Sequence, residues 1–83
     1  MGPAAWRFTA YFLAMRLRPD RATIAIDWVR QTASQPEYRR LQADGRWRCW
    51  RRIPEAGDRW LRVVLLEDGQ TIHNAFFDRG FIP

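Results

Sequence analysis

One short stretch and one histidine carry the side chains best suited to chemistry on a nucleic acid. The stretch is GRWRCWRRI, Gly45 to Ile53, in which four arginines are interleaved with two tryptophans. An arginine guanidinium binds phosphate through a planar fork, and an aromatic ring can stack on a nucleobase. His73 is the only histidine, and its side chain can exchange protons near neutral pH. These residue types favour a surface that binds single-stranded nucleic acid, with RNA as the first candidate.

The same residues suggest a reaction. Cleaving RNA without a metal requires removal of the 2′-hydroxyl proton and stabilisation of charge on the phosphate. We interpret His73 as the candidate proton-transfer group, Arg62 and Arg48 as candidates for phosphate stabilisation, and Arg79 as a further arginine that reaches the phosphate. Two other interpretations stay open: His73 is a structural or surface histidine, and Arg79 forms a local ion pair with Asp78.

Composition limits the kind of protein. The chain has 83 residues and a net charge of +5, and all fourteen of its basic residues are arginines, so we expect a single domain over residues 1–83 that binds a polyanion. The one cysteine, Cys49, is expected to be a small core residue. No metal-ligand or cofactor motif is present, and the longest apolar run is too short to span a bilayer. We therefore expect a cytoplasmic protein without cofactor, metal or membrane.

The periodicity of apolar residues divides the chain into two halves. Residues from about 4 to 34 repeat with a helical period, and we expect two helices there. The first should end before Pro19, although its residues up to about Thr9 would also suit a short strand. The second should begin after Asp20 as its N-cap and end before Pro36. Residues from about 37 to 79 alternate with the period of strands.

Two Asp-Gly turns divide the second half into hairpins, at Asp44-Gly45 and at Asp68-Gly69. The expected fold is therefore an α+β domain in which two N-terminal helices pack on one face of a four-stranded antiparallel meander. With Asp68-Gly69 as a two-residue loop, Leu65 faces Ile72 and Leu61 faces Phe76, on the side toward the helices.

This register assigns residues to the two faces of the sheet. Trp47, Cys49 and Ile53 are expected to point toward the helices. The opposite face is expected to carry an exposed set that binds nucleic acid, with His73 among its members: Arg46, Arg48, Trp50, Arg52, Trp60, Arg62 and Phe77. The alternative is that these arginines and aromatic rings pack on one another by cation–π contact and cover the sheet.

A resemblance supports a more specific hypothesis. The segment DRWLRVVLLEDGQTIHNAFFDRGF, Asp58 to Phe81, and more loosely RFTAYFLAMRLRPDRATIAIDWV, Arg7 to Val29, resemble a small toxin-like branch of the RelE/ParE-like superfamily of bacterial toxin–antitoxin modules. The resemblance implies an mRNA endonuclease, ribosome-dependent or free, and an acidic antitoxin that wraps the basic face. ParE-type relatives instead poison gyrase.

The chain departs from the RelE pattern because it has no lysine and no tyrosine in its last strands, and this departure shifts the catalytic expectation to His73. Expected partners are RNA, including ribosome-bound mRNA, an acidic antitoxin and, as an open alternative, a second copy of the chain. The competing function is a non-catalytic module that binds nucleic acid or protein through the same face.

Overall fold

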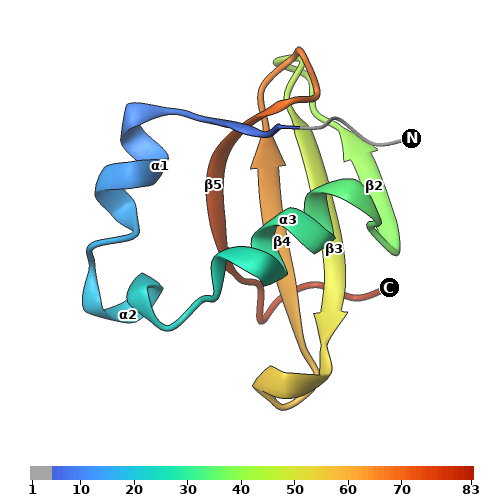
Figure 1. The fold of residues 1–83 in the computed structure, drawn as a ribbon. Coiled ribbons are helices and arrows are strands. Elements are labelled where there is room, and N and C mark those ends of the chain that lie inside the picture. Colours follow the sequence, from blue (N-terminus) through green and yellow to red (C-terminus); the bar gives the residue numbers. More distant parts are fainter. Residues whose placement is uncertain (1–4) are drawn as a thin grey trace.

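A five-stranded sheet forms the centre of the molecule (Figure 1), as seen in a computed structural model that describes residues 5–83. The strands are β1 Arg7–Phe8, β2 Tyr38–Leu41, β3 Trp47–Ile53, β4 Arg59–Leu65 and β5 Thr71–Phe77. Their order is β1-β5-β4-β3-β2. Strands β2 to β5 form the predicted antiparallel meander. The short β1 pairs in parallel with β5, which makes the sheet mixed and confirms the strand interpretation of the residues before Thr9.

The helical half is divided into three short helices: α1 Ala10–Met15, α2 Pro19–Ala22 and α3 Ile26–Ser34, and a 3₁₀ turn, η1 Pro54–Ala56, joins β3 to β4. The prediction of two helices was wrong in this detail. The first helix does end before Pro19, but Pro19 begins α2 in its first turn, a position where its missing N–H costs nothing. Asp20 therefore lies inside α2, and its prediction as an N-cap was wrong. Ala25 is extended and separates α2 from α3. Within the described residues, no helix is long and apolar enough to cross a membrane.

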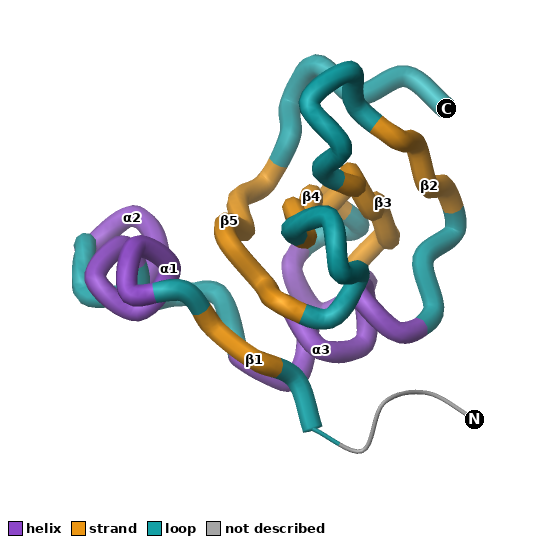
Figure 2. The backbone as a smooth tube through the Cα atoms, turned by 90° about the horizontal axis from the view of Figure 1, so that it is seen from above, coloured by secondary structure: helices purple, strands orange, loops and turns teal. Residues whose placement is uncertain are grey.

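Only α3 covers a face of the sheet. Figure 2 shows α3 on one side of β3 and β4, while α1 and α2 lie beyond the β5 edge. The prediction that two helices share one face is therefore corrected. The Thr9 hydroxyl caps α1 by accepting a hydrogen bond of 3.0 Å from the Phe12 backbone N–H. Because β1 leads directly into this cap along the sheet edge, α1 begins beside β5 and not above the sheet.

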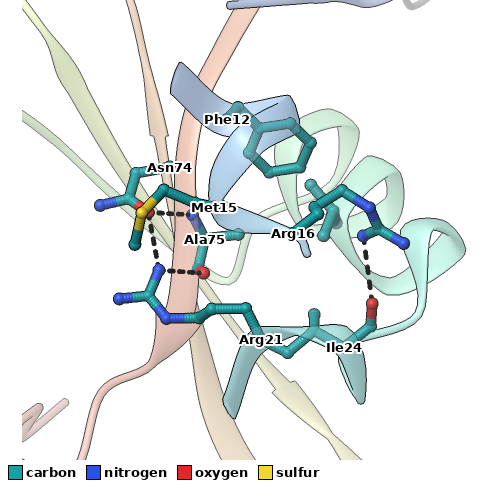
Figure 3. Close-up of a pocket in the computed structure, with 8 residues that line it drawn as sticks. Phe12, Met15, Arg16, Arg21, Ile24, Asn74 and Ala75 are labelled. Atoms are coloured by element: carbon teal, nitrogen blue, oxygen red, sulfur yellow. Dashed lines mark hydrogen bonds between the residues drawn. The ribbon is translucent and has the colours of Figure 1, made fainter. Parts of the chain in front are cut away.

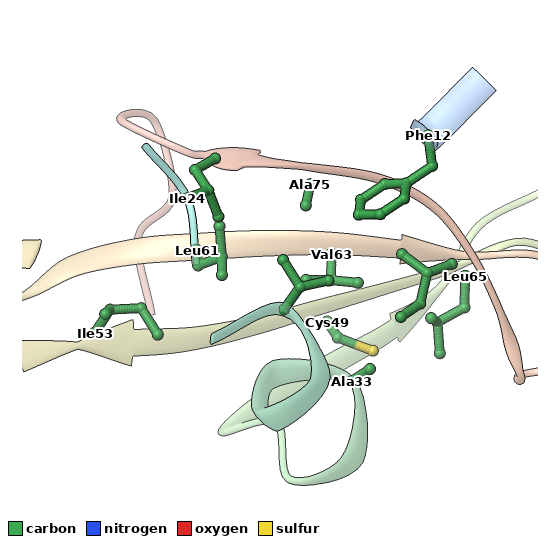
Figure 4. Packing of buried hydrophobic residues seen from close by; sticks show 11 residues of the cluster. Phe12, Ile24, Ala33, Cys49, Ile53, Leu61, Val63, Leu65 and Ala75 are labelled. Atoms are coloured by element: carbon green, nitrogen blue, oxygen red, sulfur yellow. The ribbon is translucent and has the colours of Figure 1, made fainter. Parts of the chain in front are cut away.

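The hydrophobic core fills the space between α3 and the sheet, and Figure 4 shows the close packing of its side chains. Val29 of α3 is fully buried against Cys49 and Val63 at the centre of the cluster. The remaining buried members are Phe12, Ile24, Ala33, Ile53, Leu61, Leu65, Ile72 and Ala75. The prediction that Cys49 is a core residue is confirmed.

A β-bulge changes the faces of β5. Leu65 pairs with Ile72 as the turn predicts, but the next pair joins Val64 to Asn74, so His73 is the additional residue. An extra residue exchanges the two faces of the strand beyond it. Leu61 therefore faces Phe77 and not Phe76. The assignment of Phe77 to the face away from the helices was wrong, since Phe77 packs against the core and lies near Trp28 of α3.

Two arginines, Arg16 and Arg21, hold α1 and α2 in place beside the bulged strand β5 (Figure 3). A guanidinium N–H of Arg21 donates to the Asn74 side-chain oxygen at 2.9 Å and to the Ala75 carbonyl at 3.1 Å. Arg16 donates to the Ile24 carbonyl at 3.2 Å. Arg21 thus satisfies a carbonyl of β5 beyond the residues that pair with β1, and Arg16 ties α1 to the segment between α2 and α3, so both arginines have structural roles.

The buried thiol provides a test of the core. Burial raises the pKa of Cys49 from its ordinary value of 9.0 to about 11. Because the folded pKa is the higher one, the thiol's contribution to stability is complete below about pH 9 and is lost as the pH rises toward 11. Urea unfolding between about pH 8 and pH 11 should show a steeper loss of stability for the wild type than for Cys49→Ala. Parallel curves would show that the thiol titrates as freely as in the unfolded chain.

Candidate nucleic-acid interface

The face opposite α3, called here the open face, carries side chains in rows set by strand pairing. The upper row, nearer the two Asp-Gly turns, contains Arg40, Arg48, Val64 and Asn74. The middle row contains Tyr38, Trp50, Arg62 and Phe76, and the lower row contains Arg52 and Trp60. The structure therefore brings together five of the seven residues predicted to bind nucleic acid: Arg48, Trp50, Arg52, Trp60 and Arg62. Arg46 precedes β3 at the turn end of the sheet, and Phe77 lies on the other face.

The upper row contains an uncompensated pair of like charges. Arg40 of β2 pairs directly with Arg48 of β3, and like charges placed opposite each other destabilise a sheet. Within residues 5–83 neither arginine forms a salt bridge. Asp44 lines the same hollow as both arginines, but its carboxylate pairs with Arg46 at 4.0 Å. An anion bound between Arg40 and Arg48 would remove their repulsion.

The chain's own end covers the middle row. The C-terminal segment, Asp78–Pro83, leaves β5 and passes over the open face, on the side of the sheet away from α3 (Figures 1 and 2). The Phe81 ring stacks on Trp50 with centroids 4.6 Å apart and planes at 17°. Its ring centroid also lies 5.0 Å from that of Trp60 and 5.5 Å from that of Tyr38. Trp50 is therefore only 3% exposed, and the prediction that it is an exposed stacking residue was wrong.

Asp78 fixes the start of this segment. The Trp50 indole N–H donates to Asp78 Oδ2 at 3.0 Å, and Arg62 Nε lies 3.3 Å from the same oxygen. The contact with Arg62 is an ion pair without hydrogen-bond geometry. Burial lowers the pKa of Arg62, and the charge of Arg48 lowers it further, while Asp78 opposes both effects. The expected Asp78–Arg79 pair is therefore replaced by Asp78–Arg62, and the charge of Arg62 is compensated within the protein.

Cation–π contacts occupy several of the remaining rings. The guanidinium carbon of Arg40 lies 5.8 Å from the Trp50 ring centre, and that of Arg52 lies 5.1 Å from the Trp60 ring centre. Arg62 lies over Phe76 at 4.6 Å. Mutual packing of arginines and aromatic rings, the alternative drawn from the sequence, is therefore part of how this face is built. Arg40 and Arg52 nevertheless remain exposed.

His73 has a separate environment at the bulge. Thr9 Oγ1 lies 3.1 Å from His73 Nδ1. That hydroxyl also accepts a hydrogen bond from the Phe12 backbone N–H. Because a hydroxyl has a second acceptor position as well as its own proton, the direction of the Thr9–His73 bond follows the tautomer of the ring. The Tyr11 ring stacks on the imidazole at 4.9 Å. Burial lowers the pKa of His73, and the charge of Arg46 lowers it further.

The four candidate catalytic residues do not converge on one point. His73 lies near the start of β5, whereas Arg79 follows the far end of that strand. Arg62 faces Phe76 and is engaged by Asp78, and Arg48 lies across β4 from Asn74. Arg46, and not Arg62, is the arginine whose charge acts on His73. The placement of Arg62 beside His73, and the expectation that Arg79 reaches the same phosphate, are therefore corrected.

The site residues predicted from the sequence do not include Thr9, Tyr11, Arg40 and Phe81, which lie on this face or at its edge. Thr9 had a readable signal, because a threonine before an apolar helical run is a common N-cap. Tyr11 and Phe81 had none, since their contacts join segments far apart in the chain. In the described part of the chain, no three metal-ligating side chains are grouped in a way that would hold an ion.

Comparison with known proteins returns no match: no family model, no curated protein and no solved structure is similar to this chain. The interpretation of the open face therefore rests on its geometry.

The burial of Trp50 predicts a stability effect. Trp50→Ala should lower the free energy of unfolding by about 3–5 kcal/mol, because it removes a buried ring and leaves Asp78 without the indole donor. Leu17→Ala, at a side chain that is 84% exposed, is the control and should change stability by less than about 0.5 kcal/mol. Chemical denaturation measures both variants. A Trp50→Ala protein as stable as the control would mean that the C-terminal segment does not pack as described.

Proposed function

We propose that the protein binds single-stranded RNA through the open face. The observation that carries the proposal is the facing pair of arginines, Arg40 and Arg48, which have no acidic partner among the described residues. Two like charges placed opposite each other destabilise a sheet, and a bound anion would offset that repulsion. A phosphate group is one of the anions that a guanidinium fork binds through two hydrogen bonds.

The surroundings of this pair favour a nucleic acid over a small anion. Exposed Arg52 and half-exposed Arg46 extend the positive charge along the same face, and the whole chain carries a net charge of +5. A backbone with regularly spaced phosphates matches such a row of arginines. Aromatic rings border the row, which suits a single strand whose bases are free to stack.

A second candidate function is RNA cleavage, which the environment of His73 favours. Its lowered pKa suits a general base near neutral pH, and Arg46 provides a positive charge nearby. This form of the proposal makes the protein a toxin-like endoribonuclease that acts on RNA in the cytoplasm, free or on the ribosome, and that an acidic antitoxin neutralises. Self-association into a homodimer belongs to the same proposal. The competing proposal is a non-catalytic binding module.

Salt dependence tests the binding proposal. Affinity for a short single-stranded RNA should fall steeply as salt increases, because neutralised phosphates release counterions. Arg40→Ala and Arg48→Ala should each reduce the slope of log affinity against log salt by about 0.7, the value for one phosphate contact on a single strand. Arg30→Ala, an exposed arginine on α3, removes the same charge from the other side and should leave the slope unchanged. If Arg40→Ala and Arg48→Ala had the same slope as Arg30→Ala, the open face would be excluded as the RNA-binding surface.

The pH dependence of cleavage tests the catalytic proposal. If neutral His73 is the base, the rate should rise with pH through a pKa that lies below the ordinary value of 6.5 and should level off above that pKa. His73→Gln should remove that step and slow cleavage by about 10²–10⁴-fold while RNA affinity changes little. The measurement is single-turnover cleavage of a labelled RNA. A variant that cleaves like the wild type would leave His73 with a structural role, and a wild type that cleaves nothing would favour the binding module.

A further inference from the structure

Two groups of the C-terminal segment occupy the middle of the open face as a nucleotide would. The Asp78 carboxylate binds the Trp50 indole N–H and the Arg62 side chain through a single oxygen. Three residues later, the Phe81 ring stacks almost parallel on Trp50. An anion held by an arginine beside a ring stacked on a tryptophan is the pair of contacts that single-strand binding proteins make with a phosphate and its base.

The side chains beneath the segment form a receptor for a flat ring. Trp50 provides the floor, and Tyr38 and Trp60 meet the Phe81 ring at steep angles of 60° and 64°. A hollow continues along the segment between Arg40, Tyr38 and the terminal residues. A nucleobase placed where Phe81 lies would therefore be stacked on one face and enclosed at its edges.

The segment is held in a way that allows release. The Asp78 backbone N–H donates to the Trp60 carbonyl at 2.9 Å. Beyond it, the backbone hydrogen bonds described for the segment stay within the segment, as in the 3.5 Å contact from Phe81 N to the Asp78 carbonyl. Ile82 is 87% exposed. Beyond the Asp78 backbone bond, the segment is thus attached by the side chains of Asp78 and Phe81, and losing these contacts would leave the strand pairing in place.

We propose that the C-terminal segment is an internal competitor that fills a nucleotide-binding site on the open face, with Trp50 as the base platform and Arg62 as the phosphate ligand. The ligand is one nucleotide of a single-stranded RNA, which displaces Phe81 from Trp50 and Asp78 from Arg62. This inference rests on the proposed RNA binding. It adds a specific nucleotide site and states that the C-terminal segment competes with RNA for that site. Double-stranded RNA is excluded because its paired bases cannot reach the platform.

The ring contact is tested with Phe81→Ala. Removing the competing ring should raise affinity for an eight-nucleotide oligouridine by roughly tenfold, within the range that a base–aromatic stack contributes. Ile82→Ala changes the same segment at an exposed side chain and should bind like the wild type. Affinity for a duplex of the same length should be equal in all three proteins. Thermal melting followed by circular dichroism establishes that each variant is folded.

The charge contact is tested with Asp78→Asn, which keeps an oxygen acceptor for the Trp50 indole and removes the negative charge from Arg62. In the wild type, the carboxylate that RNA displaces from Arg62 takes up a cation and offsets the counterion that one phosphate releases. The variant has no such carboxylate, so the slope of log affinity against log salt should steepen by about 0.7. Asp27→Asn, at an exposed aspartate of α3, raises the net charge equally and should leave the slope as it is. This test does not depend on the stability of Phe81→Ala.

The outcomes separate the two proposals. Tighter binding by Phe81→Ala together with a steeper slope for Asp78→Asn supports the internal competitor. A wild type that binds oligouridine with a steep salt dependence, while Phe81→Ala and Asp78→Asn behave like their controls, overturns the competitor and leaves the RNA-binding proposal intact. If neither the wild type nor any variant binds oligouridine at low salt, the RNA-binding proposal fails, and the inference fails with it.

Discussion

The organisation of the open face depends on one carboxylate oxygen, Asp78 Oδ2. It accepts the Trp50 indole N–H and compensates the half-buried Arg62. Without it, a tryptophan donor and an arginine charge would be buried without partners, and both are costly to leave unsatisfied. The same contact fixes where the chain leaves β5, and so directs Phe81 onto Trp50. The sheet is thereby covered on both sides, by α3 on one and by the C-terminal segment on the other.

This arrangement divides the arginines into two groups. Arg16, Arg21 and Arg62 are tied to carbonyl, amide or carboxylate oxygens inside the fold. Arg40 and Arg52, in contrast, lie over tryptophan rings while remaining exposed. A guanidinium that stacks on a ring keeps its N–H groups free at its edge. The tryptophans thus hold arginines of neighbouring strands in place without neutralising them.

The sequence predicted the part of the fold that local patterns encode. The Asp-Gly turns set the meander and the Leu65–Ile72 pair, and alternation along β3 placed Cys49 and Ile53 in the core. Beyond Ile72 the same reasoning failed, because the bulge at His73 exchanges the faces of β5 and no residue type in that strand signals it. The burial of Trp50 was also unpredictable from local pattern, since it depends on Phe81, thirty-one residues away. The predicted separation of a helix-facing side from an arginine-bearing side of β3 and β4 nevertheless matches the structure.

The most direct test of RNA binding by the open face uses the tryptophan indole N–H groups as reporters. In a nitrogen–proton correlation spectrum, addition of single-stranded RNA should shift the indole signals of Trp50 and Trp60. The signal of Trp28, on α3 at the opposite side of the sheet, should stay in place. A shift confined to Trp28, or no shifts at RNA concentrations that saturate binding, would contradict the assignment of RNA binding to this face.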